Sequence, residues 1–397
     1  MKVIIRLAEH LGEAAHQHGV AARIEKRTGI ERHTVAALLH NEAKYVSLEA
    51  IGKLCEYLVE EHRVERRLLP GVLLGRVPED FWQMLAGCEQ LDFCLGTRVS
   101  RQWRDAEYVM ATDSRLQGVL LSKVSRFCDA LAPPQAPPGK AAPQQDVAAA
   151  RKYADGHCHP MFHLLRGPGR DATPEDPGPD WAKICLGASQ LYQQRECPKR
   201  NATLALGSIK VNPMVELMLA NIFSTEPFVV QDKVARPRDR RCPLWFCFRE
   251  SDPKPPSCCG GVRLAAGATA GKPGLYYERD DGKWEPCLVD ERNDAAFLFY
   301  RHRLGSGRVE VACGGFSSRA THCLTEDIEA IVAALGEPQF ETNDLRVGMY
   351  VIRFTFGQGS GGRRRPDSER PFRTEVLPLA QKVLARRLLR QTGGGRP

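Results

Sequence analysis

The sequence lacks any apolar run of the roughly 20 residues that a membrane-spanning helix requires. The N-terminus also lacks the basic and then apolar pattern of a secretory signal, because the one candidate stretch is interrupted by Arg6, Glu9 and Glu13. These absences argue against an integral membrane protein and a secreted one. We therefore expect a cytoplasmic protein with no membrane partner.

A disulfide scaffold is also lacking. The chain has 14 cysteines in 397 residues, and they are scattered through apolar contexts rather than concentrated in a short segment. A thiol in such a context acts as a small buried side chain. The pattern suits a reducing compartment. No segment repeats at a fixed period, which argues against a repeat architecture.

Outside the C-terminal tail, the sequence has almost no excess of charge of one sign. The net charge is +8, but residues 363–397 hold ten Lys and Arg against three Asp and Glu, a net of +7. Everything before residue 363 is therefore close to neutral. A basic tail attracts nucleic acid, other acidic partners or counterions.

Composition and apolar spacing divide the chain into five parts, which predicts a multidomain protein. An all-α domain over residues 1–68 precedes an α/β domain of layered, Rossmann-like type, whose first part covers 69–131 and whose main part covers 181–357. Residues 132–180 form a Pro/Ala/Gly-rich linker or insertion. Residues 358–397 form a basic Gly/Arg-rich tail that turns helical from about Thr374.

Residues 1–62 have the apolar spacing of four short helices, the first beginning near Ile4. A tight turn, Thr28-Gly29-Ile30, separates the second helix from a third that runs from about Arg32 to His40. Ser47 is the expected N-cap of the fourth helix. The stretch VAARIEKRTGIERHTVAALLHN, residues 20–41, resembles the lambda-repressor/Cro-like, XRE-type helix-turn-helix family.

This resemblance implies that the third helix enters the major groove of double-stranded DNA. Arg32, His33 and Thr34 would then face base edges. Further along the groove or its phosphates would lie Ala37, His40, Asn41 and Lys44. Residues 1–75 hold 11 Lys and Arg against 10 Asp and Glu, so affinity for DNA of arbitrary sequence should be weak. The alternative is a four-helix module for protein contacts.

Three strand-to-helix junctions of the α/β part carry polar or glycine-rich residues. Open parallel sheets bind ligands outside the carboxyl ends of their strands, where helix N-termini offer free N–H groups. The G-x-G-x-x-G fingerprint is absent, so we predict only a pocket for a small phosphorylated or nucleotide-like effector, with Lys210 or Arg319 as counter-charge. The candidate ligand-binding residues are Asp113, Ser114, Ser208, Asn212, Gly314, Gly315, Ser317, Ser318 and Arg319.

Each junction also has a structural explanation. Ser114 fits a helix capping box, Asn212 precedes Pro213 as an N-cap, and two glycines permit a tight turn. Ser208, Asn212 and Glu216 raise the alternative of a nucleotide-cleaving enzyme. We expect Glu216 to be a solvated helix residue, and we assign no catalytic residue.

Two clusters invite comparison with metal sites. The run from His157 to His163, with Cys158 and His159, is too short for its side chains to converge on one ion. A structural zinc ion held by Cys242, Cys247 and Cys258 has better spacing, but the adjacent pair Cys258-Cys259 fits poorly to one tetrahedral ion. We therefore predict no metal and no other cofactor.

Together these features predict a sequence-specific transcriptional regulator, a repressor whose α/β domain senses a small effector or mediates self-association. A single recognition helix reads too few bases for useful specificity. We therefore expect a homodimer with two recognition helices about 34 Å apart. A nucleotide-processing enzyme with a DNA-binding appendage and a protein-interaction scaffold remain the alternatives.

Overall fold

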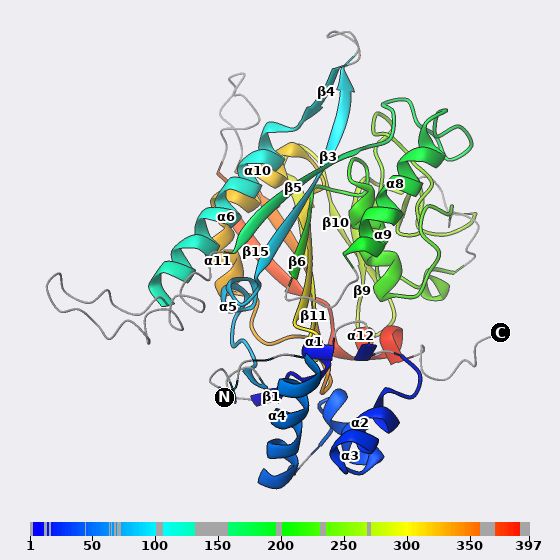
Figure 1. Cartoon of the computed structure of the whole chain (residues 1–397). Helices are drawn as coiled ribbons and strands as arrows, with labels where there is room; N and C mark the ends of the chain where they lie inside the picture. The colour runs from blue at the N-terminus through cyan, green and yellow to red at the C-terminus, as the bar shows by residue number, and fades with distance from the viewer. Residues whose placement is uncertain are drawn as a thin grey trace, which may run out of the picture.

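The computed structural model in Figure 1 places a small helical domain beside a larger layered α/β body. It describes residues 3–11, 14–15, 17–43, 45–62, 64, 66, 69, 73–100, 106–131, 158–195, 201–230, 236–267, 271–357 and 370–389.

The N-terminal domain contains the four expected helices, of which the first is shorter than expected. They are α1 (Leu7–Leu11), α2 (Val20–Thr28), α3 (Arg32–Leu39) and α4 (Leu48–His62). The residues before α1 form a strand instead, β1 (Val3–Ile5), which pairs antiparallel with β2 (Leu74–Arg76). Ser47 caps α4 by accepting a hydrogen bond from Ala50 N at 3.1 Å. The core of the domain includes Leu7, Ile24, Val35, Leu38, Leu54 and Leu58, all fully buried.

The body is built on a mixed sheet that contains nine strands among the described residues. Its order is β13-β14-β11-β12-β6-β3-β4, with β15 also pairing with β14 and β5 with β3. Strands β5, β3, β6 and β12 are parallel, and the other neighbours are antiparallel. The strands are β3 (Gln90–Ser100), β4 (Ala106–Val109), β5 (His159–Arg166), β6 (Asn201–Leu206), β11 (Asn293–Arg303), β12 (Arg308–Gly315), β13 (Phe340–Glu341), β14 (Leu345–Thr355) and β15 (Arg373–Pro378). The mixed sheet fits the expected sheet-and-helix class, and likeness to a Rossmann fold stays a prediction.

Both faces of this sheet are covered, which gives the body three layers (Figure 1). One face carries α5 (Phe81–Ala86), α6 (Ala111–Leu131), α10 (Ser318–Glu326) and α11 (Ile328–Ala333). The other carries α8 (Trp181–Gln194), α9 (Pro213–Ile222) and α12 (Gln381–Leu389) together with a second, four-stranded sheet. Its strands are β7 (Leu244–Cys247), β8 (Gly260–Gly261), β9 (Gly274–Glu278) and β10 (Trp284–Leu288). Central strands such as β6 and β12 are buried along their whole length because both of their faces are covered.

Two segments assigned outside the body contribute strands to its main sheet, which corrects the predicted boundaries. Strand β5 lies within the expected linker 132–180, and β15 and α12 lie within the expected tail 358–397. The chain after Thr374 is a strand as far as Pro378, and its helix begins only at Gln381. The apolar spacing near Thr374 suggested a helix, but pairing with the remote strand β14 overrides that local preference.

Basic residues of the expected tail hold α12 against the second sheet. Arg387 donates to Glu278 Oε2 through Nε at 2.9 Å and through a terminal nitrogen at 2.7 Å, and Arg386 donates to Glu278 Oε1 at 2.8 Å. Glu278 is buried. These two charges are therefore engaged within the protein.

The turn between β11 and β12 attaches the helical domain to the body. Leu304 of this turn packs with Ile4 and Val77 in a small buried cluster. Its neighbour Gly305 lies close enough to α3 that a Cβ there would be 3.5 Å from the Leu39 carbonyl oxygen. The end of α3 therefore has a defined position relative to the main sheet.

A pair of glycine substitutions tests the packing between β6 and β12. A Cβ on Gly314 would lie 2.5 Å from the Gly207 carbonyl oxygen, so we expect Gly314→Ala to lower the free energy of unfolding by about 1–3 kcal/mol. A Cβ placed on Gly118 in α6 would have no atom within 4 Å, so Gly118→Ala should raise the free energy of unfolding by about 0.5–1 kcal/mol. Urea denaturation measures both. Equal effects of the two substitutions would contradict the close approach.

Candidate functional site

Helices α2 and α3 meet at a tight turn that exposes one face of α3. Gly29 has a φ of +70°, a left-handed conformation that favours glycine, and its N–H donates to Glu25 O at 2.7 Å. On the inner face of α3, Val35, Leu38 and Leu39 are buried. The helix therefore packs through one side and leaves the other for a partner.

The predicted DNA-contacting residues at the start of α3 lie on this outward side. Arg32 and His33 are exposed, and Thr34 and Ala37 are partly exposed. The Arg32 backbone N–H donates to Glu25 Oε1 at 3.1 Å, so a side chain of α2 satisfies one of the free N–H groups at the helix start. The arrangement presents an arginine and a histidine at the N-terminal end of an exposed helix.

The remaining predicted contacts are placed differently. Asn41 has a φ of +54°, and its Oδ1 accepts a hydrogen bond from Ile5 N at 2.7 Å, which ties the end of α3 to β1. His40 is exposed beside a small cavity of about 30 Å³ where α3 meets the β11–β12 turn. Lys44 lies outside the described residues. The predicted set thus divides between the outward face and the domain junction.

Comparison with known families decides what this helical domain is. Residues 17–59 match the Cro/C1-type helix-turn-helix DNA-binding domain family. The N-terminal domain is an XRE-type helix-turn-helix domain. No curated protein and no solved structure matches the chain. The match ends at residue 59, so it identifies the helical domain alone. Among the described residues, no helix is long and apolar enough to cross a membrane.

The carboxyl ends of the parallel strands, where a ligand was predicted, are covered by the chain itself. All six residues from Gly207 to Asn212 are buried. A Cβ on Gly96 of β3 would overlap the Val211 carbonyl, so this loop lies directly against the strand. The Asn212 side chain donates to Cys94 O at 2.9 Å and Leu206 O at 2.8 Å, and accepts from Met214 N at 3.0 Å. The loop thus fills the edge that the sequence suggested for an effector.

The two predicted counter-charges at this edge already have partners. Lys210 Nζ donates to Asp252 Oδ2 at 3.0 Å and to Phe316 O at 2.6 Å. Its burial lowers its pKa to about 8, although Asp252 acts in the opposite direction. Arg319 donates to Asp294 Oδ2 at 3.3 Å and to the backbone carbonyls of Asp290 and Glu291. Both cations are therefore engaged in contacts within the chain.

The other candidate ligand residues are only partly brought together. Asp113 is buried beside Gly207, and burial raises its pKa to about 6. Gly314 and Gly315 belong to β12, and Ser317 caps α10 by accepting from Ala320 N. Ser208 is buried in the covering loop. Ser114 and Ser318 are exposed. Helix α6 begins at Ala111, so Ser114 lies within its first turn rather than at its cap.

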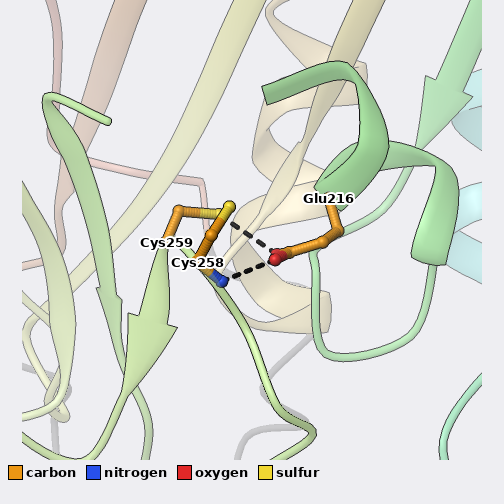
Figure 2. Close-up of side chains that lie close together, drawn as sticks. All are labelled: Glu216, Cys258 and Cys259. Carbon is orange, nitrogen blue, oxygen red and sulfur yellow. Dashed lines mark hydrogen bonds between the residues drawn. The ribbon is translucent and has the colours of Figure 1, made fainter. Parts of the chain in front are cut away.

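The expectation of a solvated Glu216 is wrong. Nine of the ten residues of α9 are buried, and Glu216 is 2% exposed. Its Oε1 accepts from Cys258 N at 2.6 Å, and its Oε2 accepts from Cys259 Sγ at 3.3 Å (Figure 2). Phe228 N also donates to Oε1 at 3.2 Å, and Ser257 Oγ donates to Oε2 at 2.7 Å. The apolar residues on all sides of α9 indicate a buried helix and were the available clue.

The Cys and His clusters are also rearranged. Cys247 donates to Val262 O at 3.4 Å and is absent from the group around Glu216, which contains Cys259 instead. In the other cluster, Cys158 donates to Cys88 O at 2.8 Å, whereas His163 Nε2 lies 2.8 Å from Asp92 Oδ1. These two side chains have different partners, and His157 lies outside the described residues.

A substitution at Asn212 distinguishes a structural role from a ligand-binding one. Asn212→Ala removes three buried hydrogen bonds, so we expect the free energy of unfolding to fall by at least about 2 kcal/mol. Ser114 is an exposed candidate residue, and Ser114→Ala should change the free energy of unfolding by less than about 0.5 kcal/mol. Urea denaturation measures both variants. An unchanged stability of Asn212→Ala would contradict the structural role.

Proposed function

We propose that the protein is a sequence-specific DNA-binding repressor that acts as a homodimer and responds to a small effector through its α/β body. The observation that carries the proposal is the Cro/C1-type domain whose α3 presents Arg32 and His33 on an exposed face. Arginine recognises guanine through two parallel hydrogen bonds in the major groove. The proposal assigns no enzymatic step to the protein.

Dimerisation through the β5 edge of the main sheet is supported by the exposed groups found there. Among the described residues, β5 pairs with β3 alone, so its other edge offers free backbone groups. Met161, Phe162 and Leu164 of β5 are 45%, 51% and 63% exposed. A monomer seldom exposes a long apolar edge strand of this kind. We therefore place a second copy of the chain on this edge.

The effector is proposed to bind in the groove between β5 and α8. This open groove has a volume of about 600 Å³, a size typical of small-molecule sites. Ile184 and Leu191 give it an apolar wall, and Lys183 supplies positive charge for a phosphorylated or nucleotide-like molecule, whereas Arg166 is already paired with Asp180 at 2.9 Å. A ligand in this groove would lie at the proposed dimer contact, so its binding would change dimer geometry and hence operator affinity.

Arg32 is the first residue to test for DNA recognition. Arg32→Ala removes one base-reading side chain without touching the buried face of α3. We expect its affinity for a duplex selected from a random library to fall by about tenfold to a hundredfold, while affinity for a shuffled duplex changes little. Titration by fluorescence anisotropy over a salt series measures both.

Lys53→Ala is the matched control, since it removes one positive charge from α4, where Lys53 pairs with Glu49 at 2.7 Å. We expect it to weaken both complexes equally and by less than about threefold. A wild-type protein that binds selected and shuffled duplexes alike would refute sequence-specific recognition.

The β5 edge is tested by placing a charge on it. Leu164→Glu should leave the fold intact and raise the dimer dissociation constant by at least about thirtyfold, because a carboxylate would be desolvated at the contact. Phe372→Glu is the control, since Phe372 is 83% exposed beside β15 at the opposite edge of the sheet. Sedimentation equilibrium measures both. A monomeric wild-type chain, or dissociation caused by Phe372→Glu alone, would exclude this surface.

A further inference from the structure

A buried group of metal-binding side chains surrounds Glu216. The ligand atoms of Glu216, Cys258 and Cys259 all lie within 4.8 Å of one another (Figure 2). All three residues are at most 3% exposed. In a tetrahedral zinc site with Zn–S bonds of about 2.3 Å, the ligand atoms are about 3.5–3.8 Å apart. Small side-chain adjustments would therefore bring these three atoms to the separation that one zinc ion requires.

A fourth ligand comes from a separate segment. Cys242, 1% exposed, precedes β7 and interacts with the thiol of Cys259, although its own sulfur lies outside the 4.8 Å group. Strands β7 and β8 are parallel neighbours with Phe246 opposite Gly260, so Cys242 and Cys258 both lie before the amino ends of the two strands. The group thus combines α9, the segment before β7 and the segment before β8, which is how structural zinc sites usually draw their ligands.

We propose that Glu216, Cys242, Cys258 and Cys259 bind one zinc ion as a closed, structural site. The three sulfur donors and one carboxylate oxygen complete a tetrahedron and leave no position for a substrate. Binding releases the three thiol protons to solvent, and no electron is transferred. The ion links α9 to the second sheet, and this assignment is independent of the proposed DNA-binding function.

Existing hydrogen bonds already orient the Glu216 carboxylate for this role. Its Oε1 accepts from the backbone N–H groups of Cys258 and Phe228, and Ser257 Oγ donates to Oε2. Metal binding would replace the bond from the Cys259 thiol to Oε2 and leave these three bonds in place. Such supporting contacts are typical of metal ligands, because they hold the donor atom in one orientation.

The vicinal cysteines are compatible with one ion because the chain turns sharply there. The sequence argument against zinc held that the adjacent pair Cys258-Cys259 fits poorly to one tetrahedral ion. Both thiols lie within the 4.8 Å group, and Ser257 Oγ accepts a hydrogen bond from Cys259 N at 3.1 Å within the turn. Among the described residues, Glu216, Cys258 and Cys259 form the group of at least three Cys, His, Asp or Glu side chains whose ligand atoms all lie within 4.8 Å of one another.

Metal content of the full chain tests the proposal. The protein, purified without chelator from zinc-supplemented culture, should contain about one zinc ion per chain by plasma mass spectrometry. Exchange into cobalt(II) should produce the near-ultraviolet sulfur-to-cobalt charge-transfer bands and visible bands of a tetrahedral thiolate site. A chain that contains no zinc and takes up no cobalt overturns the proposal, whatever its DNA affinity.

Two cysteine variants locate the ion. Cys259→Ser should lower bound zinc at least tenfold. Cys247→Ser should retain it, because Cys247 is equally buried but bonds to Val262 O away from the group. If Cys259→Ser fails to fold, the cobalt(II) spectrum of the wild-type chain tests the site in its place. Zinc retained by folded Cys259→Ser, or cobalt bands without thiolate charge transfer, would place the metal elsewhere.

Discussion

The side chain of Asn212 joins the three elements from which the rest of the α/β body is built. It donates to Cys94 O in the middle of β3 and to Leu206 O at the end of β6, and it accepts from Met214 N in the first turn of α9, with no exposed surface. Because Cys94 lies 118 residues from Asn212 in the chain, one amide links β3 to the end of β6 and caps the helix that follows. The covering loop and the burial of Glu216 both follow from this arrangement.

Because the loop from Gly207 to Asn212 covers the strand ends, a ligand site has to be sought on other surfaces of the body. Helix α8, which lines the β5 groove, also carries Tyr192, whose hydroxyl donates to the buried Glu310 of β12 at 2.9 Å. Burial alone would raise the pKa of Glu310, but Arg301 and Arg308 outweigh it and hold that pKa below its usual range. The β11–β12 turn beside this network lies next to Leu39 of α3, since Gly305 and Leu39 line the same small cavity. Packed and hydrogen-bonded groups therefore connect the groove to the helix-turn-helix domain.

Local features made the N-terminal domain predictable. The 3.6-residue spacing, the glycine turn and the cap at Ser47 act over a few residues, so α2, α3 and α4 follow from sequence together with the outward position of Arg32. Strand β15 was missed because its pairing partner is a remote strand, and β5 because it lies beside a proline-rich stretch that suggested a linker. Asn212 was found as a helix cap, but its bond to Cys94 O depends on the position of β3.

The helix-turn-helix domain, the outward face of its third helix and the alternation of helices and strands in the body could be predicted from the amino-acid sequence. Each depends on side-chain spacing within one element. The contacts between remote segments had to come from the structure: Cys259 rather than Cys247 lies beside Glu216, and a loop covers the predicted ligand edge. Those outcomes depend on which distant segments pair across the sheets, because proximity between remote residues is set by sheet register and layer packing.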